Sequence, residues 1–189
     1  MILNNTNSSI SVCSNALLLL AHPAISSFDE IGAGPALCKN LYPNTYRSFL
    51  SLSNWNWATK TATLTMLNET PISKEFKYVY LLPVDTVRVT TCYPITNYSI
   101  EGTRIYTYSK IDNIEYQGYV EEENIPPVAI EALQYLLASK LAYPLTNDPK
   151  KTELYTNLAQ KSLQQARFTD SQNDVNQGYI DYTLTNVRN

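Results

Sequence analysis

Residues 77–92 read KYVYLLPVDTVRVTTC, and this stretch decides the fold class. It is rich in Val, Tyr and Thr, which are enriched in β-strands. Pro83 divides the stretch, because proline cannot donate a backbone hydrogen bond inside a sheet. We therefore expect two strands here, Lys77–Leu82 and Thr86–Cys92, joined by a turn that contains Asp85.

The same composition continues on both sides of this stretch. Three further runs have it and are predicted to be strands: Thr61–Leu67, Thr103–Tyr108 and Ile114–Val120. Prolines and the pair Glu101-Gly102 separate the runs, as turn residues do. Residues 61–122 therefore form one β-rich block.

Helical patterns precede the block. A short helix is predicted to begin at a cap, Ser11 or Ser14, and to run to about Ala21, where His22-Pro23 ends it. A second helix is predicted from Pro35 to about Ser53, because its apolar residues recur at steps of three and four. Pro43 lies inside it, which predicts a kink or two shorter helices.

Helical patterns also follow the block. A helix with a strong apolar face is predicted from Pro126-Pro127 until Pro144 ends it. A last helix is predicted to begin at Asn147 or Asp148 and to run to about Arg167.

Together these patterns predict an α+β fold, in which a helical bundle carries an inserted antiparallel β-domain and an extended C-terminal arm. The predicted divisions are 1–60 and 123–168 for the bundle, 61–122 for the insert and 169–189 for the arm.

The amino-acid composition narrows the classes of function that the protein can have. Only 16% of the 189 residues are charged, so much of the surface is expected to face other subunits, although a surface rich in Thr, Asn and Ser would give the same composition. The net charge of -3 argues against a protein that grips nucleic acid through phosphates. The 15 tyrosines suit interfaces, and they also suit ordinary strands.

Neither a metal nor a cofactor is expected. The chain has 3 cysteines, Cys13, Cys38 and Cys92, in no C-x-x-C spacing, and His22 is its one histidine. We expect reduced thiols made in a cytosol. Leu17–Leu20 belongs to an apolar run too short to cross a bilayer, and no basic segment precedes it, so neither a membrane span nor a signal peptide is expected.

No catalytic constellation is recognisable, and the protein is not expected to be an enzyme. The loop Gly32-Ala33-Gly34 lacks the lysine and spacing of a phosphate-binding loop. The run Glu121–Glu123 is predicted to be solvated, ahead of a helix start. Asp85 suits a turn and has no partner carboxylate for acid–base work. Arg88 is expected to pair with Asp85 or with a neighbour.

Trp55 and Trp57 have two readings. Two close indoles can form a platform for sugars, or they can anchor a core in which their N–H groups find backbone partners. The core reading is the better supported, because buried aromatic rings dominate packing.

The final residues alternate apolar and polar side chains. Ile180, Tyr182 and Leu184 are separated by Asp181 and Thr183, which is typical of a strand. Such a segment can add a strand to a neighbour's sheet, or it can be a docked or disordered terminus. The residues alone leave both readings open.

Several short motifs, in their order, resemble one known family. The most specific are Trp55–Ala58 (WNWA) and Leu82–Val89 (LPVDTVRV), preceded by the LLLLAHPAI run at 17–25. Across residues 10–170 the chain resembles the tail tubular protein A family, the head-to-tail adaptors of podovirus-type phages. Two positions depart from the family: Ala21-His22 stands where it commonly has Gly, and Pro43 interrupts a helix that it favours unbroken.

The resemblance implies a structural virion protein, assembled in the host cytoplasm. Such adaptors form a ring of about twelve subunits by heterologous contacts. The ring lies between the portal protein and the tail tube or nozzle, and genomic DNA passes through its lumen without sequence-specific binding. On this reading we expect assembly roles for eight residues: Trp55, Trp57, Asp85 and Arg88, which would hold the insert to the bundle, and Tyr179, Ile180, Tyr182 and Leu184 of the arm, which would make contacts between chains.

Two alternatives are retained. One is a tail protein that binds or cleaves carbohydrate, with the tryptophans as the sugar platform. The other is a head-completion or stopper ring of a different phage type, which differs from the adaptor only in its neighbours.

Overall fold

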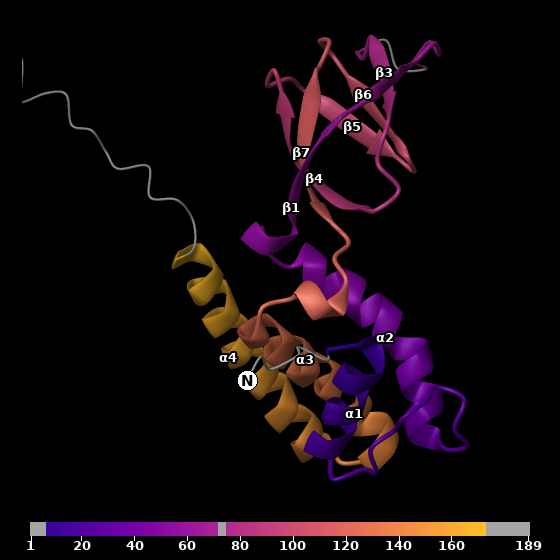
Figure 1. Ribbon diagram of the computed structural model, residues 1–189, viewed down its shortest axis with the longest axis vertical. Helices are drawn as coiled ribbons and strands as arrows, with labels where there is room; N and C mark the ends of the chain where they lie inside the picture. Colours follow the sequence, from indigo (N-terminus) through magenta and orange to yellow (C-terminus); the bar gives the residue numbers. More distant parts are fainter. Residues whose placement is uncertain (1–6, 72–74, 173–189) are drawn as a thin grey trace, which may run out of the picture.

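The computed structural model describes residues 7–71 and 75–172 (Figure 1). The predicted α+β class is confirmed, because two small antiparallel sheets are inserted between N-terminal and C-terminal helices. The sheets form one lobe, here called the insert, and the four helices of the described part form the other, here called the bundle (Figure 1). Of the predicted arm, 169–189, the first four residues belong to the last helix, and residues 173–189 lie outside the described residues.

The bundle consists of α1 (Ser9–Leu19), α2 (Ala33–Ser51), α3 (Pro127–Thr146) and α4 (Pro149–Gln172). α3 packs against each of the other three. Their shared core contains residues from both ends of the chain, among them Leu17, Phe49 and Leu137, all fully buried. Burial of these apolar faces stabilises helices whose propensity alone would not.

α1 begins earlier than predicted. Ser8 is its N-cap: the Ser8 hydroxyl accepts from the Ser11 N–H, and the Ser11 hydroxyl accepts from the Ser8 N–H. This reciprocal pair is a capping box, so Ser11 lies inside the helix and is not its cap. The helix also ends earlier, at Leu19, and Ala21 takes a left-handed conformation with φ of 59°.

α2 is one continuous helix, which excludes the predicted split at Pro43. Buried residues lie on both sides of the proline, including Cys38 and Tyr42 before it and Tyr46 and Phe49 after it. Packing of this face against the bundle outweighs the helical hydrogen bond that proline removes.

The last two helices are longer than predicted. Pro144 lies in the last turns of α3, and Asn147, with φ of 49°, closes the helix. The N-cap of α4 is Asp148, whose carboxylate accepts from the N–H of Lys150 at 2.9 Å. α4 continues past Arg167 to Gln172, because Asp170 accepts from the backbone of Asn56 at 2.8 Å.

The insert contains a three-stranded sheet of order β1-β7-β4 and a four-stranded sheet of order β2-β3-β6-β5. The strands are β1 (Thr59–Thr63), β2 (Thr65–Leu67), β3 (Tyr78–Leu81), β4 (Thr86–Tyr93), β5 (Tyr98–Glu101), β6 (Arg104–Thr107) and β7 (Asn113–Gly118). All pairs are antiparallel. The inner faces enclose a second, smaller core around Tyr80, Ile105 and Ile114.

Two strand predictions were wrong. The run Thr61–Leu67 is not one strand: the chain leaves the first sheet at Leu64 and enters the second as β2. Strands that change sheet in this way form the corners of a sandwich. The strand β5 was missed because it is only four residues long and ends at a turn. Gly102 in this turn has φ of 60°, a conformation that glycine adopts readily.

Candidate functional site

The bundle meets the insert where the chain crosses between them, just after α2 and just after β7. Trp55 lies at the first crossing and is fully buried. Its indole N–H donates to the carbonyl of Phe49 at 3.1 Å, and its ring stacks on the Phe49 ring with centroids 5.0 Å apart. Trp55 therefore anchors this crossing to the end of α2.

Gln117 of β7 connects the anchor to the insert. Its side chain is fully buried; its carbonyl oxygen accepts from the backbone N–H of Trp55 at 3.0 Å, and its amide donates to the hydroxyl of Thr59 at 2.8 Å. Thr59 in turn donates to the carbonyl of Trp55 at 2.8 Å. Because each of these polar groups has a partner, the contact stays satisfied without water.

Sequence reasoning missed Gln117. In strand β7 the apolar residues Ile114 and Tyr116 alternate with polar ones, so Gln117 looks like a side chain that faces solvent. The position is buried because this end of the sheet lies against the Trp55 crossing. The burial of Gln117 therefore becomes visible only once the segments around Trp55 and Gln117, which lie far apart in the sequence, are in contact.

Trp57 packs beside Trp55, with ring centroids 5.6 Å apart, and is half-buried. Its indole N–H has no hydrogen-bond partner among residues 7–71 and 75–172. The core reading of the pair is confirmed for Trp55, which has no exposed surface. A fully buried ring cannot stack on a sugar, so the pair does not form the platform that a carbohydrate-binding role needs.

Arg88 also connects the two parts. It lies opposite Gln117 in the register of β4 and β7, and its guanidinium donates to the side-chain oxygen of Asn54, just before Trp55. A charged donor makes a stronger hydrogen bond than a neutral one. The sequence left two partners open for Arg88, Asp85 or a neighbour. The structure gives this bond to Asn54 and not to Asp85.

Asp85 organises the base of the insert. Its carboxylate lies 2.7 Å from the ammonium of Lys60 and accepts from the hydroxyl of Tyr116 at 3.1 Å. Partial burial raises the pKa of Asp85, but the hydrogen bond and charge of Lys60 lower it more, so the net pKa is below its usual value. These polar partners all belong to the insert and none to the bundle.

Gly118 leaves room for this ion pair. A Cβ atom at Gly118 would lie 2.7 Å from Cδ of Lys60 and 3.1 Å from the carboxylate of Asp85. Both distances are shorter than normal contacts, so any larger residue would push Lys60 away. The absence of a side chain at Gly118 therefore lets Lys60 lie close to the backbone of β7 while it pairs with Asp85.

A groove of about 880 Å³ lies beside this contact, and we call it the waist groove. One helix face forms much of its lining: Lys39, Tyr42, Pro43, Tyr46, Arg47 and Leu50 of α2. The insert contributes residues 84–87, and the chain after β7 contributes Tyr119, Glu121 and Glu122. Ser9 of α1 and Phe28 complete the lining.

Glu122 is nearly buried, so the prediction of a solvated acidic run was wrong at this position. The hydroxyl of Tyr42 donates to its carboxylate at 2.6 Å, and the hydroxyl of Tyr46 donates to the carbonyl of Val120. Burial, followed by the bond to Glu122, raises the pKa of Tyr42 far above its usual value. Both tyrosines therefore stay protonated and tie α2 to the chain after β7.

Tyr179, Ile180, Tyr182 and Leu184 lie outside the described residues, so their assembly role stays a prediction. Within residues 7–71 and 75–172, no group of three or more His, Cys, Asp or Glu side chains could hold a metal ion. In that part of the chain, no helix is both long and apolar enough to span a membrane.

No family model matches this chain, and no curated protein matches it.

Proposed function

We propose that this protein is a subunit of a head-to-tail adaptor ring of a phage, which joins the portal to the tail and continues the DNA channel. The supporting observation is the chain topology. A β-insert lies between two halves of a helical bundle, which is the arrangement that the resemblance to the tail tubular protein A family implies. The proposed role is mechanical and requires no catalytic group or cofactor.

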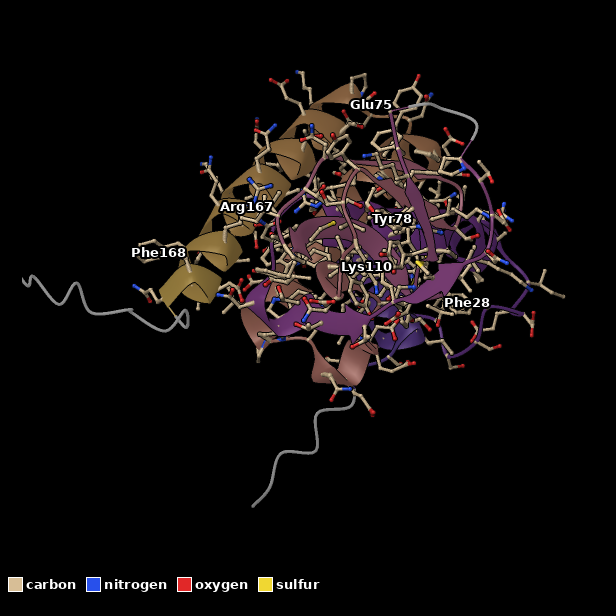
Figure 2. The ribbon with its side chains drawn as sticks, turned by 90° about the horizontal axis from the view of Figure 1, so that it is seen from above. Phe28, Glu75, Tyr78, Lys110, Arg167 and Phe168 are labelled. Atoms are coloured by element: carbon tan, nitrogen blue, oxygen red, sulfur yellow. The ribbon has the colours of Figure 1, made fainter. Side chains whose placement is uncertain are left out.

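Exposed apolar side chains support a role in assembly. Ile31 before α2, Val84 between β3 and β4, and Ile95 between β4 and β5 are almost completely exposed. Phe168 is 64% exposed and projects outward from the end of α4 (Figure 2). The four lie on both lobes. A ring requires two different contact surfaces on each subunit, because its contacts are heterologous.

The charge distribution supports passage of DNA without tight binding. Residues 59–124 contain six Lys and Arg and nine Asp and Glu, a difference of -3 that equals the net charge of the whole chain. The rest of the chain, which supplies the helices, is therefore neutral overall. A protein that neutralises phosphates needs clustered basic residues.

The arm offers a test of the proposal. We expect the double substitution Ile180→Asp and Leu184→Asp to weaken binding to the portal of the same phage, because it places charge on the apolar side of the predicted strand. The matched control, Thr183→Asp with Thr185→Asp, adds the same charge on the other side. Native mass spectrometry of each variant mixed with portal measures the complex.

The unsubstituted chain should give a complex with about twelve copies per portal ring. Equal binding by both variants would contradict the role of the arm. Absence of any complex, with both proteins folded, would contradict direct docking on the portal.

A further inference from the structure

The waist groove has an apolar lining with no occupant among the described residues. The polar groups of Tyr42 and Tyr46 are already used in bonds to Glu122 and Val120, so their rings present mainly carbon to the groove. Val84, which is completely exposed, stands at its edge. Apolar surface of this kind is stabilised when another apolar segment covers it.

The groove lining also includes Lys39 of α2, whose carbonyl has a proline at the position of its usual helical donor. Pro43 has no N–H, so the carbonyl of Lys39, four residues earlier, lacks its usual helical donor. Both residues belong to the lining. A segment lying along α2 can therefore donate a backbone hydrogen bond to this carbonyl as well as cover the apolar surface.

We propose that the occupant is the chain's own segment Met1–Leu3, which docks in the waist groove as a strap between the bundle and the insert. Three consecutive apolar residues, Met1, Ile2 and Leu3, are followed by the polar linker Asn4–Ser8. The linker leads directly into Ser9, which is itself part of the groove lining. The first residue of α1 therefore lies at the groove, and the segment before it is attached there.

The lengths agree. Leu3 precedes Ser9 by six residues, which span at most about 20 Å when extended. The face of α2 from Lys39 to Leu50 is about 16 Å long, at 1.5 Å per residue. The segment is therefore long enough to lie along this face of α2, and Val84 of the insert belongs to the same lining.

The strap would contact α2 on one side and residues 84–87 of the insert on the other. It would then add to the polar contacts of Gln117 and Arg88, which already hold the two parts together. This inference does not depend on the proposed adaptor role.

Disulfide trapping tests the strap in the full-length chain. The substitutions Leu3→Cys and Val84→Cys are combined, and the protein is oxidised mildly with copper phenanthroline. Native Cys13, Cys38 and Cys92 are at most 2% exposed and remain unreactive. The matched control combines Leu3→Cys with Ile95→Cys, which is 85% exposed on a turn at the end of β4.

We expect the Leu3–Val84 pair to cross-link within one chain at least about tenfold faster than the control pair, because docking raises the effective concentration. Equal rates would overturn the proposal. A cross-link between two chains would assign the groove to a second copy, and faster trapping of Leu184→Cys by Val84→Cys would assign it to the C-terminal arm. Either result would also overturn it.

Hydrogen exchange gives an independent readout without new cysteines. We expect the amides of residues 84–87 to exchange faster in the variant Ile2→Asp with Leu3→Asp than in the unsubstituted protein. The control Asn4→Asp with Asn5→Asp adds the same charge in the linker and should leave exchange unchanged. Equal exchange in all three proteins would contradict the strap.

Discussion

At the residue scale, the bundle and the insert are held together by a few buried polar contacts. Gln117 makes two hydrogen bonds from a fully buried position, and the Trp55 ring fills the space beside it. A buried polar side chain costs free energy when its partners are lost, because the remaining groups stay desolvated. Single substitutions here should therefore have large effects.

Gln117→Ala should lower the free energy of unfolding by about 2–4 kcal/mol, because it leaves the buried Trp55 N–H unpaired, removes the donor to the Thr59 hydroxyl and opens a cavity. Urea denaturation measures the change. Gln160→Ala on the exposed side of α4 is the matched control and should change stability by less than about 0.5 kcal/mol. A loss at Gln117 no larger than the control's would contradict its role.

Ala21→Gly should stabilise the protein by roughly 0.5–1 kcal/mol. Ala21 has φ of 59°, and a Cβ in this left-handed conformation costs about 1–2 kcal/mol. The gain exceeds the entropy that glycine adds to the unfolded chain, which is about 0.4–1 kcal/mol. Ala24→Gly, at an exposed position without positive φ, should destabilise instead. If both substitutions shift the thermal midpoint downward, the strain at Ala21 is refuted.

At the element scale, three strands meet at the base of the insert through one carboxylate. Asp85, just before β4, binds Lys60 of β1 and Tyr116 of β7. Its backbone carbonyl also accepts from the N–H of Tyr119 at 2.8 Å. The charge on Asp85 therefore supports the pairing of β1, β7 and β4.

This arrangement predicts a dependence on pH. The folded pKa of Asp85 is below its ordinary value of 3.8, so its contribution to stability is present above that value and is lost as the pH falls through the folded pKa. Asp85→Asn should be less stable than the unsubstituted protein at pH 6, and the difference should shrink below about pH 4. Denaturation at both pH values measures this, and a constant difference would contradict the charged contact.

The sequence predicted the order of elements well, for physical reasons. Apolar residues at helical spacing located the four helices of the described part of the chain, and Val, Tyr and Thr located most of its strands. It did not predict that the run through Leu64 enters a second sheet, because both halves have the same alternation. It also missed the burial of Gln117 and Glu122, because their partners, Trp55 and Tyr42, lie far away in the chain.

At the scale of the whole molecule, two cores are joined at a narrow contact. The larger core belongs to the helices and the smaller one to the sheets. Viewed from above, Tyr78 and Lys110 of the insert lie over the bundle, whereas Phe168 lies at the periphery (Figure 2). The two lobes therefore present separate surfaces, as a ring subunit with neighbours beside, above and below it requires.

The measurement that tests the adaptor proposal most directly is electron microscopy of the purified protein mixed with the portal of its phage, beside each protein alone. We predict a ring stacked coaxially on the tail-side face of the portal, with about twelve subunits and a continuous channel. Both proteins folded but unassociated, or a ring that never contacts the portal, would contradict the adaptor role and place the protein elsewhere in the tail.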